Sequence, residues 1–177
     1  MAELTLVRQV HADPACSLAV PEEFDLGVAD GVLLAARAPD GMFSSSPFAP
    51  NLTLLVQPLA PGADREQLAV DSLAFSQRTF NAWRLIDRTD VEIAGLPGER
   101  TLATYLVRPG SGVELGRDVV VAVEQWHLYD DGLLWTISCS CESADYGQLS
   151  DLWSVLAESF EPGLPPPADA GEEELAA

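Results

Sequence analysis

The residues of this chain that come nearest to a metal site are His127, Cys139 and Cys141. They fall on two segments that Asp131-Gly132 would join as a β-hairpin, because this dipeptide is a strong hairpin signal. With a two-residue turn, His127 lies opposite Thr136 and points away from the face that carries the cysteines. With a three-residue turn, His127 shares their face, but Cys139 lies about 13 Å further along the strand. Zinc needs all its ligands within ~2.3 Å of the metal, so neither register predicts a zinc site.

The residues available for nucleophilic or acid–base catalysis form no recognisable set. The only two histidines, His11 and His127, do not lie beside a Gly-x-Ser-x-Gly elbow or a known cysteine motif. The three serines at 44–46 have no base near them in the sequence and are typical of a solvated turn. The Gly-containing loop 109–112 lacks the lysine and the helix start that hold a phosphate. The sequence therefore indicates a protein that is not an enzyme, with no catalytic residue, no cofactor and no metal.

The three cysteines are typical of buried, inert thiols. Cys139 and Cys141 are two apart in a predicted strand, so their Cα atoms lie near the ~7 Å limit for a disulfide, and Cys16 makes the count odd. No basic segment followed by an apolar run marks a secretion signal, and no stretch approaches the ~20 apolar residues of a membrane span. We therefore expect a cytoplasmic protein without membrane insertion.

The charge of the chain is strongly negative. Its 177 residues include 28 acidic and nine basic ones, all nine of them arginine, for a net charge of −19. Nucleic acid and anionic membranes attract clustered basic residues, so this charge excludes both as partners. A partner with a basic face remains compatible, although the acidity also serves plain solubility.

The first half of the chain contains short strands and one helix. Asp64 is placed to cap this helix, with Gln67 as the partner in a capping box. Trp83 is expected to close the helix, and residues 38–50 form a loop by composition. The apolar stripe of the helix consists of Ala69, Leu73 and Phe80. The predicted strands are residues 4–10, 16–20, 32–36 and 51–57.

The second half has the clearer pattern. Segments 85–93 and 99–107 flank Gly95-Leu96-Pro97-Gly98, which predicts a tight turn. Segments 118–129 and 133–141 flank the Asp-Gly turn in the same way. A strongly amphipathic helix closes the domain, with one apolar face made of Leu149, Leu152, Trp153, Leu156 and Phe160.

This order predicts an α+β fold, with an antiparallel sheet of six to seven strands packed with two main helices. Residues 1–161 form a single domain in this prediction. Residues 162–177 are rich in proline and glutamate and are predicted to be a disordered acidic tail.

Two features are candidates for a partner-binding surface. The first is the loop 41–48, which places Met42, Phe43 and Phe48 where solvent is expected. These side chains either fold back and cap one end of the sheet or form a docking patch. The second is the sheet itself. If both helices pack on one face, the other face is bare and Trp126 and Trp135 line a groove. If one helix covers each face, no such groove exists.

The pattern of turns and core positions resembles the LpqN-type and DcrB-type proteins of the PsbP-like superfamily. The resemblance covers roughly residues 32–160 and implies an α/β/α sandwich with a binding or adaptor role. Known members include lipid-anchored actinobacterial proteins, a photosystem subunit, a binder of a small nuclear GTPase and chaperones for secreted effectors. Unlike the lipoproteins, this chain has no apolar segment before Cys16. The motifs that carry the resemblance are Gly95-Leu96-Pro97-Gly98, Thr104-Tyr105, Glu124-Gln125-Trp126, residues 133–140 and Glu158-Ser159-Phe160.

The leading hypothesis from the sequence is therefore a non-enzymatic, cytoplasmic adaptor that binds another polypeptide, including as a chaperone or adaptor for a secreted protein. One alternative is a small-molecule or lipid binder that uses an apolar sheet face. Another is an enzyme of unrecognised type. The sequence also leaves a homodimer open.

Overall fold

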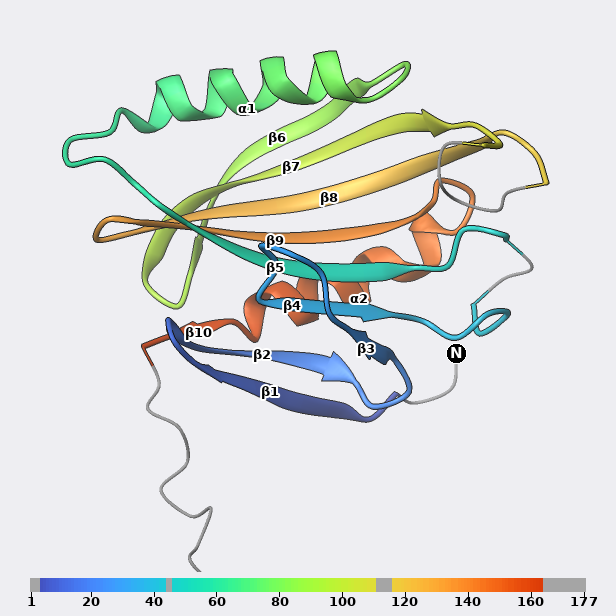
Figure 1. Ribbon diagram of the computed structural model, residues 1–177, viewed down its shortest axis with the longest axis horizontal. Coiled ribbons are helices and arrows are strands. Elements are labelled where there is room, and N and C mark those ends of the chain that lie inside the picture. Colours follow the sequence, from blue (N-terminus) through green and yellow to red (C-terminus); the bar gives the residue numbers. More distant parts are fainter. Residues whose placement is uncertain (1–3, 44–45, 111–115, 164–177) are drawn as a thin grey trace, which may run out of the picture.

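Seven antiparallel strands form the main sheet of the protein (Figure 1). The computed structural model describes residues 4–43, 46–110 and 116–163. The strand order across the sheet is β3-β4-β5-β9-β8-β7-β6. Together with two helices, this sheet confirms the predicted α+β fold. The strands are β3 (Asp25–Gly27), β4 (Leu34–Arg37), β5 (Asn51–Pro58), β6 (Arg84–Ile93), β7 (Leu96–Val107), β8 (Val119–Asp130) and β9 (Leu133–Glu142).

A second, three-stranded sheet was not predicted. It consists of β1 (Leu6–Ala12), β2 (Ala15–Pro21) and β10 (Glu161–Pro162) in the order β1-β2-β10. The sequence predicted strands close to β1 and β2 but did not assign them to a sheet of their own. In β10, Pro162 lies opposite Cys16, and the backbone N–H of Gly163 donates to the carbonyl of Ala15 at 2.7 Å. The domain thus continues through residue 163, and the rest of the predicted tail lies outside the described residues.

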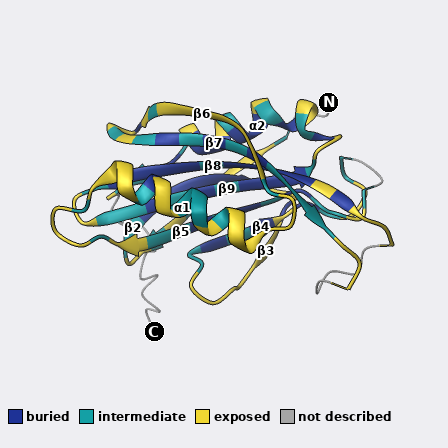
Figure 2. Cartoon of the chain, turned by 90° about the horizontal axis from the view of Figure 1, so that it is seen from above, coloured by how far each residue is buried: buried dark blue, intermediate teal, exposed yellow. Residues whose placement is uncertain are grey.

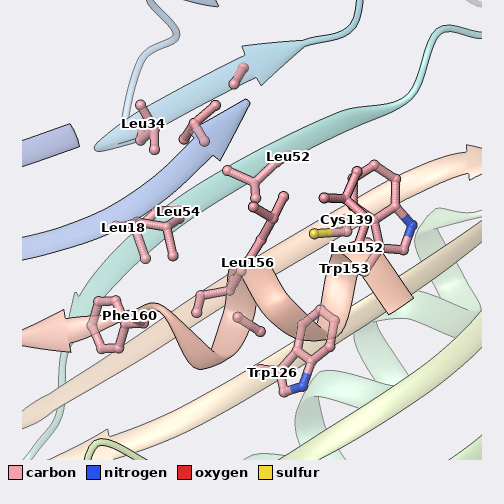
Figure 3. Packing of buried hydrophobic residues seen from close by; sticks show 14 of the residues in the cluster. Leu18, Leu34, Leu52, Leu54, Trp126, Cys139, Leu152, Trp153, Leu156 and Phe160 are labelled. Atoms are coloured by element: carbon pink, nitrogen blue, oxygen red, sulfur yellow. The ribbon is translucent and has the colours of Figure 1, made fainter. Parts of the chain in front are cut away.

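Helix α2 (Tyr146–Glu158) fills the space between the two sheets. Its predicted apolar face is confirmed, because Leu149, Leu152, Trp153, Leu156 and Phe160 are all buried. Phe160 lies just beyond the end of the helix, and its ring is 5.2 Å from that of Trp135. Figure 3 shows Leu18 of β2 and Leu54 of β5 in this same cluster. Burying five such side chains contributes on the order of 10 kcal/mol before chain entropy is counted.

Helix α1 (Arg65–Thr79) covers the opposite face of the main sheet. Asp64 caps it as predicted, since Asp64 Oδ1 accepts from the N–H of Glu66 at 2.9 Å. The guanidinium of Arg65 lies over the ring of Tyr129 in β8. Neighbouring residues of a strand point to opposite faces of a sheet. Leu128 belongs to the core beneath α2, so Tyr129 and α1 lie on the other face. The packing of α1 is much lighter than that of α2, and Figure 2 shows it mainly as exposed and intermediate.

The predicted apolar stripe of α1 therefore holds only in part. Ala69 is its one buried member, Leu73 is half-buried and Phe80 is exposed. The helix also ends at Thr79 rather than at Trp83, because the backbone of Phe80 is already extended. An amphipathic pattern predicts a helix well, but how deeply the helix is buried depends on the side chains of the sheet that face it.

The turn predicted at 95–98 is shifted in the structure. Ile93 pairs with Leu96, so the loop of the β6–β7 hairpin consists of Ala94 and Gly95, with φ of 53° and 76°. Two residues with positive φ match the twist of the flanking strands, which is why this short loop is favoured. Gly98 instead lies inside β7. A Cβ at Gly98 would meet the carbonyl oxygen of His127 at 2.3 Å, so this glycine permits the close approach of β8.

The structure also decides between the two arrangements of helices. One helix lies on each face, which is the arrangement in which no open groove was expected at Trp126 and Trp135. Trp126 borders a cavity of about 250 Å³ beside Arg100 and Ser154, while a partner-binding role for the two tryptophans stays a prediction. Trp126 is 3% exposed and Trp135 is 1% exposed, both in the core beneath α2.

Candidate functional site

A cavity of about 460 Å³ lies where the start of α1 meets the β6–β7 hairpin. It opens on the α1 side of the main sheet. It is lined by Arg65, Glu66, Arg88, Asp90, Val91, Pro97, Gly98, Glu99 and Tyr129. We refer to it below as the Glu99 pocket. A neighbouring cavity of about 330 Å³ shares Arg65 and Tyr129 with it and extends along the 59–63 loop and the β8–β9 turn.

Glu99 is the buried charge of the pocket, with 5% of the residue exposed. Arg88 of β6 holds one of its oxygens, because Nε and Nη2 of Arg88 lie 2.7 Å and 2.5 Å from Glu99 Oε2. Among the described residues, none donates a hydrogen bond to the other oxygen, Oε1. Glu99 is one of the residues that line the cavity.

Glu99 is part of a polar row that crosses four strands. Backbone pairing places Asp90 of β6, Glu99 of β7, His127 of β8 and Thr136 of β9 next to one another in that order. Paired residues point to the same face of a sheet, so all four side chains lie beneath or beside α1. Asp90 and Glu99 are like charges directly opposite each other, an arrangement that destabilises a sheet unless a cation lies nearby.

His127 is buried next to Glu99 and does not line the pocket. Its Nδ1 lies 3.2 Å from Thr136 Oγ1. Burial lowers the pKa of His127 and the charge of Arg88 lowers it further, while the carboxylate of Glu99 opposes this shift. The imidazole is therefore neutral near pH 7. The pairing with Thr136 confirms the two-residue turn, which places His127 on the opposite face from Cys139 and Cys141.

Tyr129 supplies the aromatic surface of the pocket. The guanidinium carbon of Arg65 lies 5.1 Å from the centre of its ring, within the range of a cation–π contact. Burial raises the pKa of the Tyr129 hydroxyl, and the negative charge of Glu99 raises it further. The phenol is therefore protonated at neutral pH. Glu66 and Asp90 are exposed carboxylates that line the same cavity.

A second polar cluster lies on the α2 side of the sheet. Glu124 of β8 is 1% exposed and forms an ion pair with Nε of Arg100. The hydroxyl of Tyr146, at the start of α2, donates to Glu124 Oε2 at 3.1 Å. Arg100 also reaches Asp87 Oδ2 at 3.1 Å. Although burial alone would lower the pKa of Arg100, its hydrogen bond and charge interaction with Glu124 raise it. This cluster joins α2 to three strands and is structural.

The thiols offer no nucleophile. Burial raises the pKa of Cys16 to about 11 and that of Cys141 to about 12, and it also raises that of Cys139. His11 lies opposite Cys16 in the β1–β2 hairpin, but a thiol with so high a pKa is not ionised near pH 7. Within residues 4–43, 46–110 and 116–163, no three His, Cys, Asp or Glu side chains are grouped to hold a metal ion.

The predicted partner-binding residues are not brought together. Trp126 and Trp135 are buried, as described above. Met42 and Phe43 are half-buried against the core, where the Phe43 ring is 6.1 Å from that of Phe24. Phe48 packs against Val119 and Val121 at the start of β8. The described part of the 41–48 loop thus folds back onto the domain, and none of the five predicted residues lines the Glu99 pocket.

The sequence did not predict the residues of the pocket, because they come from four separate segments of the chain. Glu99 and Arg88 each looked like one charge among many in an acidic chain. The hairpin register of β6 and β7 is the only signal that pairs Asp90 with Glu99, and the sequence predicted this turn in a shifted position. The molecule thus has a helix on each face of an antiparallel sheet, with a charged pocket at one end of α1.

No family model matches the chain, and no curated protein matches it either. Solved structures do, and their similarity shows that the chain shares the fold of cyanobacterial PsbP, LpqN and Mog1p. Cyanobacterial PsbP (CyanoP) from Synechocystis sp. PCC 6803 has a TM-score of 0.60 at 14% identity, covering 92% of this chain and 95% of that chain. LpqN of Mycobacterium tuberculosis, described as involved in cell envelope biogenesis, has a TM-score of 0.58 at 13% identity, covering 89% and 90%.

The Ran-binding protein Mog1p of Saccharomyces cerevisiae has a TM-score of 0.56 at 12% identity, covering 90% of this chain and 96% of that chain. In the described part of the chain, neither helix is long and apolar enough to cross a membrane.

Proposed function

We propose that this protein is a non-enzymatic binding module, an adaptor that recognises another polypeptide through the Glu99 pocket. The observation that carries the proposal is the state of the ionisable groups in that pocket. Arg88 holds the Glu99 carboxylate, the Tyr129 phenol stays protonated beneath Arg65, and His127 is buried outside the cavity. None of these groups is an activated nucleophile or a free acid–base pair, so the pocket is suited to recognition rather than to covalent chemistry.

The charged lining and the extent of the site favour a polypeptide over a small apolar molecule. Small-molecule pockets are mostly lined by apolar side chains, whereas five of the nine residues of the Glu99 pocket carry a charge. The neighbouring cavity continues past Arg65 and Tyr129 and lengthens the region that an extended segment could contact. Helix α1 beside it leaves Val70 and Phe75 exposed at 49% and 60%. An elongated, mixed surface of this kind is typical of protein recognition.

We further propose that this adaptor is cytoplasmic. The three cysteines are free and buried, as is usual for proteins kept in a reducing compartment. The Ran binding of Mog1p and the involvement of LpqN in envelope biogenesis belong to those proteins, and the fold that they share with this chain supports the proposed binding role. An adaptor or chaperone for a secreted protein is one role that fits these properties.

Affinity capture of the full chain from its native cells tests the proposal. The bait is compared with Asp90→Arg, which reverses a charge on the pocket rim, and with Asp151→Arg, which makes the same change on the exposed side of α2. We expect a polypeptide that co-elutes in stoichiometric amounts with the wild type and Asp151→Arg but not with Asp90→Arg. A chain that captures no such polypeptide contradicts the adaptor function, and a partner retained by Asp90→Arg contradicts the pocket as its site.

A further inference from the structure

The Glu99 pocket has more acceptors than its own cations satisfy. Asp90 and Glu99 are paired across β6 and β7, and Arg88 neutralises only Glu99. Within the described residues, no hydrogen bond or ion pair engages the carboxylate of Asp90, the carboxylate of Glu66 or Oε1 of Glu99. Counting Arg65 above the Tyr129 ring, three carboxylates face two guanidinium groups in this pocket, and one further cation would balance the remaining negative charge.

We propose that the cation completing this site is the guanidinium of a single arginine side chain of the partner. This assignment rests on the proposed function, because it names what the adaptor recognises. A guanidinium is planar, donates up to five hydrogen bonds and stacks on an aromatic ring. Asp90, Glu66 and Glu99 Oε1 supply acceptors, and Tyr129 supplies the ring. A lysine ammonium is a point charge that would use the carboxylates but gain less from the ring.

Arg65 shows that the ring of Tyr129 accommodates a guanidinium. It is an exposed residue at the first position of α1, and its guanidinium carbon is 5.1 Å from the ring centre. An incoming arginine competes with Arg65 for this ring and is repelled by its charge. Replacing Arg65 with alanine is therefore expected to strengthen binding of an arginine ligand several-fold. Arg78, in the last turn of the same helix, provides the matched control, since Arg78→Ala removes the same charge far from the pocket.

The overall charge of the chain supports the same occupant. A net charge of −19 attracts a basic partner at long range, and the pocket adds a specific contact at short range. Long-range attraction alone would not distinguish one carboxylate from another. A contact at the pocket depends on Asp90 and is insensitive to a carboxylate on the opposite side of the sheet.

The test is an NMR titration of the full-length chain with N-acetyl-arginine amide, following the backbone amides of Gly98 and Glu99. The citrulline amide, which has the same shape without the charge, and the blocked lysine amide serve as ligand controls. We expect a dissociation constant on the order of millimolar for the arginine probe, typical of one side chain, and binding at least tenfold weaker for citrulline. Asp90→Asn should weaken arginine binding about fivefold or more, while Asp151→Asn leaves it unchanged.

Equal shifts with citrulline, or an Asp90→Asn variant that binds arginine as well as the wild type, overturn the proposal. Equal binding of lysine overturns the guanidinium assignment, and an effect of Arg78→Ala as large as that of Arg65→Ala overturns the role of the Tyr129 ring. The two proposals fail separately. If a native partner is captured but the arginine probe does not bind, the adaptor function stands and this occupant is wrong. If the probe binds but no partner is captured, the site stands and the function is wrong.

Discussion

The buried ion pair between Glu124 and Arg100 gives the sharpest test of how the sheet and α2 are joined. Glu124→Gln keeps the shape of the side chain and an acceptor for the Tyr146 hydroxyl but removes the charge. Arg100 would then lose its buried counter-ion while Asp87 remains beside it at 3.1 Å. Removing one partner of a buried pair leaves the other charge without compensation, which is more costly than never burying the pair.

The expected loss follows from how deeply each partner is buried. Breaking a fully buried pair costs roughly 3–5 kcal/mol. The Glu124 side chain is 1% exposed, but that of Arg100 is 26% exposed, so water and Asp87 still compensate part of its charge. We therefore expect a loss near the lower end, about 3 kcal/mol. For a domain of this size, 1 kcal/mol lowers the melting temperature by roughly 2–4 °C, which gives a fall of about 6–12 °C.

Urea denaturation followed by tryptophan fluorescence measures this loss, with calorimetry for the melting temperature. Asp40→Asn is the control, because its ion pair with Arg37 is largely exposed and should contribute less than about 1 kcal/mol. The double variant Glu124→Gln/Arg100→Met should recover part of the loss, since it leaves no buried charge unpaired. A loss with Glu124→Gln no larger than with Asp40→Asn would refute the assignment of this pair as a structural link.

Three further predictions concern stability. Trp153→Ala should cost about 3–5 kcal/mol in a urea titration because the side chain is fully buried, whereas Val155→Ala, exposed on the same helix, should change stability by less than about 0.5 kcal/mol. Gly98→Ala should lower the melting temperature sharply, because the new Cβ would meet the His127 carbonyl. Gly147→Ala in α2 should instead raise stability by up to about 1 kcal/mol. A larger loss of stability with Gly147→Ala than with Gly98→Ala would contradict the packing. Burial lowers the pKa of His127, so as the pH falls below the ordinary value of 6.5 the unfolded chain takes up a proton before the folded chain does, and stability should fall. Between pH 7.5 and 5.5, the His127→Gln variant should lose less stability than the wild type. Parallel curves of stability against pH for the two proteins would argue against a buried neutral imidazole.

Parts of the fold follow directly from local sequence patterns. The spacing of Leu149, Leu152, Trp153 and Leu156 predicts α2 and its buried face, and the Asp-Gly pair gives the register of β8 and β9. Both signals work because one short segment contains all the information. The sheet of β1, β2 and β10 was beyond this kind of inference, because a two-residue strand at 161–162 has no periodicity and depends on β2 for its pairing.

Local sequence patterns are even less informative about the functional residues. Large apolar residues in a loop, such as Met42, Phe43 and Phe48, indicate a docking patch, but such residues are equally able to fold back onto the core. The prediction for Trp126 and Trp135 depends on a bare sheet face, and local sequence does not indicate which face a distant helix covers. The charges of the Glu99 pocket gain their meaning only from cross-strand pairing, and a shift of the β6–β7 turn was enough to hide it.

A polypeptide partner that docks at the Glu99 pocket must contact the residues that line it. Site-specific photo-crosslinking in the native cells tests this contact most directly, with a photoreactive residue placed at Pro97, which lines the pocket, and at Val155 on the exposed side of α2 as the control. We expect a discrete crosslinked protein from position 97 and none from position 155. Crosslinks from position 155 alone, or none from position 97 while the chain remains folded, would contradict docking at the pocket.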